Sequence, residues 1–273
     1  MSFPFLEQLL TPAGRVLFDP VLQMFWAFAL TAARLGGLLS AGPVFGQSVV
    51  PHNVRVLLIL ALAFVLAPIA QPETTLSVPE TSLQVVAPIA LEFAVGFVLG
   101  LGVMIILSGL QLAGQLIDQQ LGTAFATTIN PDLGASVSVT GQMFFVLAGT
   151  VLLVMEPING DLLLLSALVE TFQAMPIGAS SIPADTAFVL TELVHKSLVL
   201  ALRVAAPVLA ALSLVTLTLG VIGRSMPQVN QLTLGFPLRF CTGLFVLGLS
   251  LSGILEEVVE AVPDALNEVR ILF

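Results

Sequence analysis

Charge is the scarcest property of this chain. Its 273 residues include 8 Lys and Arg and 17 Asp and Glu, so 9% are charged, against roughly 25% in an ordinary soluble domain. With so few basic residues and a net charge of −9, the chain lacks the basic clusters that bind nucleic acid. Hydrophobic residues make up 57% of the sequence, which excludes disorder and exceeds what a soluble fold of this size can bury. The composition therefore predicts an integral membrane protein, or a subunit enclosed in a larger assembly.

Cysteine, tyrosine and tryptophan are almost missing as well. The single cysteine, Cys241, excludes an internal disulfide and a cysteine-based zinc site, and its apolar surroundings predict an inert buried thiol. There is no tyrosine and one tryptophan, Trp26, whereas typical membrane proteins carry belts of both residues at the headgroup level. The missing belts indicate that much of the apolar surface meets protein rather than lipid.

About six apolar blocks, joined by short polar segments, predict an all-α fold of long, kinked helices. The sequence shows no strand-like alternation and no barrel-type segments, so helices are the remaining membrane-compatible structure. The fifth block would extend ~54 Å as one helix at about 1.5 Å per residue, which exceeds a bilayer core of about 30 Å. We expect it to bend at Pro207 or to leave the membrane. The blocks lie near Val21–Leu39, Val54–Ala70, Val85–Ala113, Val137–Met155 (followed by the shorter Leu162–Met175), Ala187–Ile222 and Leu238–Val259.

Charged residues lie inside these blocks, among them Arg34, Glu92, Lys196 and Arg203. A charge that faces lipid is expensive, so each is expected to face protein or water. We interpret Arg34, Glu92 and Arg203 as polar contacts between helices or between subunits. One turn after Glu92, Gly96 and Gly100 form a small-xxx-small pair, which predicts close packing of two helices.

No enzyme, cofactor site or metal site is predicted. Glu192 and His195 have the Glu-x-x-His spacing of di-iron bundles, but such a site needs a second copy of the motif, and the other histidine, His52, has no such partner. Asp118 and Asp132 lie in a polar connecting segment, where solvated or capping roles are expected rather than a shared-proton pair. Motifs for a serine nucleophile, a zinc protease or a phosphate loop are absent from the sequence.

Two polar segments carry an ordered set of motifs. One is Gly114-Gln-Leu-Ile-Asp-Gln-Gln-Leu-Gly122, followed by Thr123-Ala-Phe125-Ala and Asn130-Pro131; the other is Met226-Pro-Gln-Val-Asn230, followed by Leu234-Gly-Phe-Pro-Leu238. Further motifs lie around them in order: Gly42–Phe45, Val50-Pro51, Asn53–Arg55, Ala67-Pro68, Leu168–Phe172 and Met175–Gly178. Over roughly residues 30–250 this set resembles the FliR/SctT family of type III export-gate proteins, and the second segment favours the flagellar branch. The chain departs from the family at Gly160-Asp161, where members often have Gly-His.

The resemblance implies a fold and an assembly. The chain would be a single domain over residues 1–273, in which a FliP-like part (about 1–180) is joined to a FliQ-like part (about 181–273). One copy would join about five FliP and about four FliQ, with FlhB and FlhA beside them, in a gated channel for unfolded flagellar proteins. This export gate would also template the rod. It would belong to the bacterial inner membrane and the flagellar basal body, largely on the periplasmic side of the membrane plane.

The resemblance also implies two sites. The segment after Leu121 would be a pore plug, in which apolar side chains exclude water and glycines act as hinges. The plug residues are Leu121, Gly122, Phe125, Ile129, Asn130, Pro131 and Gly134. A rigid turn at the cytoplasmic entrance would consist of Pro227, Asn230, Gly235 and Pro237.

Two other functions stay open. An injectisome SctT protein would form the same kind of gate with different partners. A secondary transporter for a small solute would explain the buried charges and the Gly/Pro-interrupted helices, although the two halves of the sequence show no convincing inverted repeat.

Overall fold

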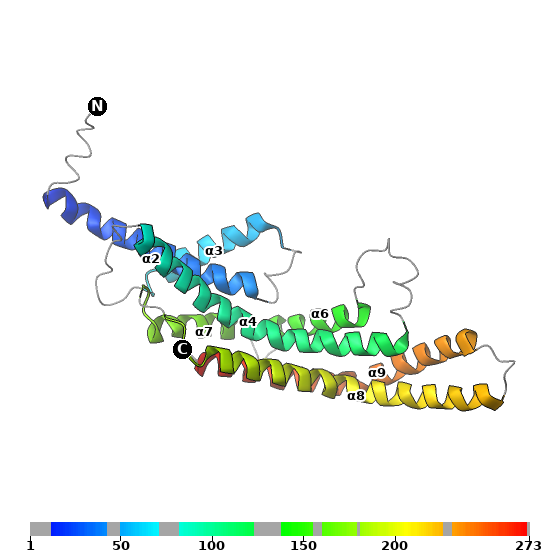
Figure 1. The fold of residues 1–273 in the computed structure, drawn as a ribbon. Coiled ribbons are helices and arrows are strands. Elements are labelled where there is room, and N and C mark those ends of the chain that lie inside the picture. Colours follow the sequence, from blue (N-terminus) through cyan, green and yellow to red (C-terminus); the bar gives the residue numbers. More distant parts are fainter. Residues whose placement is uncertain are drawn as a thin grey trace. The chain divides into compact units, whose positions relative to one another are not determined.

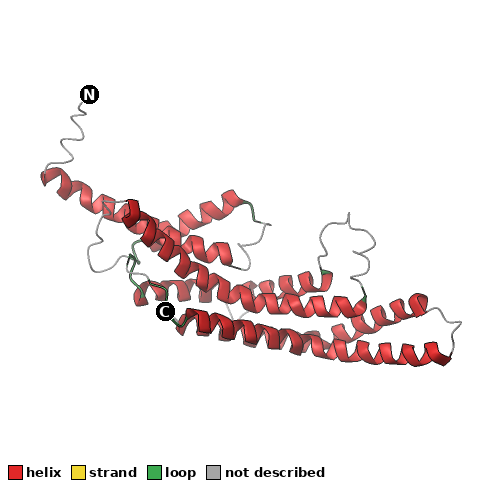
Figure 2. Ribbon diagram, in the orientation of Figure 1, coloured by secondary structure: helices red, strands yellow, loops and turns green. Residues whose placement is uncertain are grey.

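The computed structural model describes residues 12–42, 50–70, 82–122, 138–154, 160–178, 181–225 and 231–271. These residues form seven α-helices, and no strand occurs among them (Figure 1; Figure 2). The prediction of an all-α fold is confirmed. The helices are α2 (Pro12–Ala41), α3 (His52–Leu66), α4 (Ser82–Leu121), α6 (Val139–Val154), α7 (Gly160–Ala174), α8 (Thr186–Ser225) and α9 (Gln231–Ile271).

The helices follow the predicted apolar blocks, and several extend beyond them. The fourth block and the shorter stretch after it, which the sequence separates, form the two helices α6 and α7. The fifth block becomes α8, whose 40 residues include Pro207 without a break in the helix. At about 1.5 Å per residue α8 is ~60 Å long, twice the core of a bilayer.

Among the described residues, four helical segments are long and apolar enough to cross a membrane: Pro20–Ala41, Gln84–Leu121, Thr186–Ser225 and Gly235–Ala261. The chain itself buries only 33% of an apolar 18-residue stretch in the third segment, and only 17% of such a stretch in the fourth. The prediction of a buried Cys241 is wrong, because this thiol lies on the fourth segment and is exposed. Much of the apolar surface of α8 and α9 is therefore left for lipid or for other chains.

The chain divides into two compact units that alternate along the sequence. Unit 1 comprises residues 1–102, 162–187 and 268–273, and unit 2 comprises residues 103–161 and 188–267. The first part of α4 belongs to unit 1 and the rest to unit 2. The predicted FliP-like and FliQ-like parts divide the chain at a different place, and that division stays a prediction.

In unit 1, α2 packs against α3 and crosses α4 at contact distance between the two backbones. A Cβ atom at Gly96 would overlap the carbonyl oxygen of Arg34, and a Cβ at Gly37 would overlap the carbonyl oxygen of Phe93. At Gly100 a Cβ would lie 2.5 Å from the carbonyl oxygen of Leu38. The close packing predicted from the small-xxx-small pair is confirmed, and it places α2 directly on the face of α4 that carries Glu92.

In unit 2, α8 and α9 form an antiparallel hairpin. Arg203 near the middle of α8 bonds Glu257 late in α9, whereas Leu219 late in α8 contacts Gly235 early in α9. Other glycines bring further helices of this unit close together. Gly109 of α4 faces the backbone of Ser197 in α8, and Gly114 of α4 faces Gly141 in α6.

Candidate functional site

Among the described residues of unit 1, Arg34 of α2 and Glu92 of α4 form a fully buried ion pair. The Arg34 Nε atom donates to Glu92 Oε2 over 2.6 Å. Both side chains are 0% exposed. A buried charge must be compensated by its partners, and the Gly37 and Gly96 contacts explain how the two helices come close enough for this pair to form.

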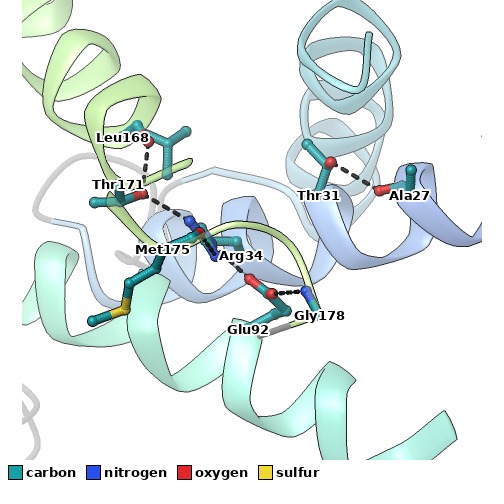
Figure 3. Close-up of polar contacts among 8 residues, drawn as sticks. All are labelled: Ala27, Thr31, Arg34, Glu92, Leu168, Thr171, Met175 and Gly178. Atoms are coloured by element: carbon teal, nitrogen blue, oxygen red, sulfur yellow. Dashed lines mark hydrogen bonds and ion pairs between the residues drawn. The ribbon is translucent and has the colours of Figure 1, made fainter. Parts of the chain in front are cut away.

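The remaining polar atoms of this pair are bonded to α7 and to the turn that follows it (Figure 3). The Arg34 guanidinium donates to Thr171 Oγ1 over 3.1 Å and to the carbonyl oxygen of Met175 over 3.1 Å. The backbone N–H of Gly178 donates to Glu92 Oε1 over 2.9 Å. Thr171 in turn donates to the carbonyl oxygen of Leu168 over 2.6 Å.

The geometry of this network is that of a clamp. The Arg34 guanidinium lies 4.4 Å from the centre of the Phe172 ring, a cation–π contact. Gly178 has φ 83, a conformation that glycine adopts without strain. The network therefore connects α2, α4 and the turn after α7 through one pair of opposite charges, and it fixes the relative positions of these three elements.

A second polar cluster, in unit 2, holds together the two ends of the segment predicted to be the plug. Asp118, in the last turn of α4, is 6% exposed. Its Oδ2 atom accepts hydrogen bonds from Ser138 Oγ (2.6 Å) and from the N–H of Thr140 (3.1 Å), and its Oδ1 accepts from Thr140 Oγ1 (2.5 Å). Ser138 Oγ also accepts from the N–H of Gly141 over 2.8 Å, as an N-cap residue does. Asp118 lies in α4 and is buried, so its predicted place in a connecting segment and the solvated role are wrong. Of the two predicted roles, capping is the one observed, because Asp118 accepts a backbone N–H in the first turn of α6.

The α4 end of this segment is built by Leu121 and Gly122. Gly122 has φ 83, and its N–H donates to the carbonyl oxygen of Asp118 over 3.1 Å, which is a left-handed C-cap. The Leu121 side chain is 2% exposed and contacts Gly243 of α9. Leu121 is thus a packed residue of unit 2. The other predicted plug residues, Phe125, Ile129, Asn130, Pro131 and Gly134, lie outside the described residues.

Replacing Asp118 with alanine should weaken the contact between the end of α4 and the start of α6. The variant leaves the N–H of Thr140 and two hydroxyls without their buried acceptor, which costs roughly 1–3 kcal/mol. We expect a lower midpoint in thermal unfolding of the solubilised protein. A matched control is Ser108→Ala on the same helix, since Ser108 bonds the carbonyl oxygen of Met104 within its own helix. Equal thermal unfolding midpoints for the two variants would show that Asp118 does not stabilise the contact between α4 and α6.

The third predicted contact, Arg203, is placed differently from Arg34. Its Nη1 atom donates to Glu257 Oε2 over 3.0 Å, but the Arg203 side chain is 62% exposed and that of Glu257 30%. An exposed pair contributes about 0–1 kcal/mol. In α8, Lys196 Nζ lies 4.0 Å from Glu192 Oε1, and these two side chains are 43% and 46% exposed. Among the described residues, neither Lys196 nor Arg203 is part of a buried clamp.

Replacing Arg203 with leucine therefore distinguishes a contact that stabilises this chain from a contact between subunits. The loss of an exposed pair should leave the thermal midpoint of the chain nearly unchanged. If Arg203 is an inter-subunit contact, the amount of assembled complex recovered from the membrane should fall. Full recovery of the complex together with normal motility would remove Arg203 from the interface.

A family model described as "Bacterial export proteins, family 1" matches residues 25–264. The chain belongs to this family. Its match includes the Arg34–Glu92 clamp, the Asp118 cluster and the α8–α9 hairpin, so the two units are both part of the export-protein fold.

Curated relatives of this export protein are similar over most of their length. The flagellar biosynthetic protein FliR of Pectobacterium carotovorum is 28% identical over 255 residues, which is 91% of this chain and 94% of the relative. FliR of Bacillus subtilis is 29% identical over 233 residues, 84% of this chain and 87% of the relative. FliR of Escherichia coli is 29% identical over 219 residues, covering 78% and 80%. The resemblance seen in the ordered motifs is confirmed by these matches.

The predicted entrance turn of this export protein is described only in part. Pro227 and Asn230 lie outside the described residues. Gly235 and Pro237 lie within α9, which begins at Gln231, so their surroundings are helical rather than a turn. Gly235 is buried and faces the side chain of Leu219, whereas Pro237 is exposed. The small residue at 235 is explained by the close approach of α8.

Sequence reasoning missed the partners of the predicted charges. Thr171, Met175 and Gly178 stood in motifs that supported the family resemblance, but the sequence assigned no role to them. Their part in the clamp depends on a backbone carbonyl, a backbone N–H and one hydroxyl. The signal available in the sequence was a polar residue inside an apolar block, Thr171, followed by Gly178 after the end of the helix.

Proposed function

We propose that this export protein is a subunit of the flagellar type III export gate, which assembles with FliP and FliQ into the channel for unfolded flagellar proteins. The observation that carries the proposal is the similarity to curated FliR proteins over most of both chains. Their flagellar names favour this branch over the injectisome. As a channel subunit and a template for the rod, the protein would need no catalytic residues and no cofactor.

The uncovered apolar surface supports a role within an assembly. In α9 the exposed side chains include Phe245 at 69% and Leu249 at 68%, and in α8 they include Leu217 at 67%. Large apolar side chains left exposed in this number indicate a protein or membrane contact. The hairpin of α8 and α9 therefore provides surface for neighbours such as FliP, FliQ, FlhB and FlhA in the bacterial inner membrane, with the gate largely on the periplasmic side.

The assembly is testable by co-expressing the chain with the products of neighbouring genes and weighing the purified complex by native mass spectrometry. We expect one copy of the 28.6 kDa chain together with about five FliP and about four FliQ. Injectisome homologues in place of FliP and FliQ would assign the chain to the injectisome branch. A monomer or a simple homodimer would contradict the export-gate proposal and would favour a small-solute transporter.

The gating part of the proposal places the plug between Gly122 and Ser138. Asp118 bonds Ser138 and Thr140, so the two ends of the segment are held close together. Removing residues between them should therefore not strain α4 or α6. Apolar constrictions close a pore by excluding water, and this closure would be lost with the segment.

Deletion of residues 123–134 should leave assembly intact and make the membrane permeable to small ions. The measurement is ion leak in cells or vesicles that contain equal amounts of the complex, with the undeleted chain as the control. An unchanged leak together with normal export would contradict the plug assignment.

A further inference from the structure

A long stretch of unit 2 contains two arginines and no carboxylate. Residues 204–255, which include the end of α8 and the start of α9, contain Arg224 and Arg239 as their charged residues and no Asp or Glu. Arg224 is exposed in the last turn of α8, where solvent can reach it. Arg239 lies within α9 and is only partly exposed. The two cations therefore have different surroundings, and only Arg239 is held against the apolar surface of the hairpin.

The contacts of two glycines place Arg239 on the side of α9 that packs against α8. Arg239 follows Gly235 by one turn and precedes Gly243 by one turn, so the three residues share one face of the helix. A Cβ atom at Gly235 would lie 3.3 Å from Leu219 of α8. One at Gly243 would lie 3.4 Å from Leu212 of the same helix. Arg239 is therefore opposite the residues of α8 between Leu212 and Leu219, and not at the end of the hairpin.

The Arg239 guanidinium is not neutralised by the described part of the chain. Its Nε atom is buried and has no hydrogen-bond partner among the described residues. The carboxylate of Asp118, one turn before the residue of α4 that contacts Gly243, accepts its hydrogen bonds from Ser138 and Thr140 at the start of α6. A buried donor without an acceptor is costly, so an acceptor from outside these residues is required.

The surface around Arg239 is apolar and aromatic. Phe236 and Phe240 are exposed and stack on each other, with their ring centroids 6.2 Å apart, and Leu238 between them is exposed as well. A charge set among such side chains is expensive against hydrocarbon. Arginine together with aromatic residues is instead typical of the centre of a protein interface. This composition indicates a protein partner that supplies the opposite charge.

The position of Arg239 along the hairpin favours a protein carboxylate over a lipid phosphate. Thr216, in the middle of the α8 stretch that faces Arg239, precedes the exposed Arg224 by eight residues, or ~12 Å at about 1.5 Å per residue. Lipid phosphates form a layer at the bilayer surface, whereas a carboxylate on a neighbouring protein segment can lie at any depth along the contact. Backbone at membrane depth must satisfy its own hydrogen bonds, so that segment is a helix.

We propose that the face of α9 around Arg239, formed with Phe236, Leu238 and Phe240, is a docking surface for a helix of a neighbouring gate subunit that carries an Asp or a Glu. The carboxylate accepts hydrogen bonds from the Arg239 guanidinium, and apolar side chains of the same helix cover the two phenylalanine rings. The inference rests on the proposed function, because it states the chemistry that one neighbour in the export gate must present.

A cross-link between groups in direct contact identifies the carboxylate. The chain has one lysine, Lys196, and Lys196→Arg removes it. Arg239→Lys then places a single lysine amine at position 239, and Arg224→Lys places it at 224 as the matched control. A carbodiimide joins a lysine amine to a touching carboxylate in an amide bond and leaves as its urea. The reaction is run on the complete complex, purified after co-expression with the products of neighbouring genes, and mass spectrometry identifies the joined peptides.

We expect position 239 to be joined to an Asp or Glu of another subunit, and position 224 to give no such product. A link from 239 to Asp132, which lies outside the described residues, would show that the chain neutralises its own arginine and would overturn the inference. The absence of any product at 239 would assign Arg239 to a lipid phosphate or to water, and would overturn it as well.

Loss of the charge should weaken the assembly without weakening the chain. Arg239→Leu leaves the carboxylate of the neighbour without its cation, so the affinity of the contact should fall by at least about tenfold and less complex should be recovered. Arg224→Leu should leave the recovery unchanged. The thermal midpoint of the solubilised chain alone should not fall with Arg239→Leu, because the Nε atom has no partner among the described residues.

Two results of this comparison would overturn the docking surface. One is unchanged recovery of the complex with Arg239→Leu, which would leave the proposed function standing. The other is a lower thermal midpoint of the chain alone, which would give Arg239 a role inside the chain. The proposed function itself fails if the unmodified chain forms no complex, so the two failures are distinguishable.

Discussion

Replacement of Arg34 with leucine should cost about 3–5 kcal/mol of folding free energy, because it leaves the buried Glu92 carboxylate without its cationic partner. Glu92 would keep the N–H of Gly178 as a donor but lose the Arg34 Nε bond of 2.6 Å. The carbonyl oxygen of Met175 would lose its guanidinium donor as well. We expect most of the variant to precipitate when solubilised membranes are heated to a temperature that the unmodified chain survives. The readout is the amount of soluble chain after heating.

The matched control is Arg203→Leu, which makes the same chemical change at an ion pair that is 62% exposed on the arginine side. Its expected cost is about 0–1 kcal/mol. A double variant, Arg34→Leu with Glu92→Leu, removes both charges and should recover part of the loss. Recovery should be incomplete, since Gly178 and Met175 still lose their partners. Equal losses for the two single arginine variants would refute the clamp.

The burial of Arg34 and Glu92 could be predicted from the sequence because it follows from the cost of one charge in an apolar segment. Their pairing could not, because it depends on where two helices cross, 58 residues apart in the chain. The same reasoning left open whether Arg203 faces protein or water, and its side chain is 62% exposed beside Glu257. That residue also lies in an apolar block, but the chain leaves most of α8 uncovered. A sequence reports that a charge needs a partner, and only the packing decides whether the partner is protein or water.

The positions of the helices could also be predicted in part from the sequence, whereas most of their lengths and ends could not. The fifth apolar block is longer than a bilayer core and predicted a long helix, and α8 has 40 residues. The helices α4 and α9, with 40 and 41 residues, extend well beyond the apolar blocks predicted for them. The glycine and proline at 235 and 237 suggested a turn, since both residues disfavour helix interiors. In the structure they lie inside α9, where Gly235 permits contact with Leu219. Local propensity was overridden by packing at that position.

The helices α2 and α4 cross at Gly37 and Gly96, next to the Arg34–Glu92 ion pair. Gly37→Ala and Gly96→Ala should each destabilise unit 1, because the new methyl group would meet backbone atoms of the opposite helix. Backbone cannot move aside as a flexible side chain can, so the cost should reach or exceed the roughly 1–3 kcal/mol of ordinary overpacking. Separating the helices would also lengthen the Arg34–Glu92 bond. The readout is again the soluble chain that remains after heating.

Gly36 provides the control within the same turn of α2. A Cβ atom there would lie 3.9 Å from the side chain of Phe93, an ordinary van der Waals contact. Because alanine also favours a helix by about 1 kcal/mol over glycine, Gly36→Ala should be neutral or stabilising. The two neighbouring substitutions thus have opposite expected signs although they change the same atoms. If Gly36→Ala and Gly37→Ala lose stability equally, the backbone contact between α2 and α4 does not exist in the folded protein.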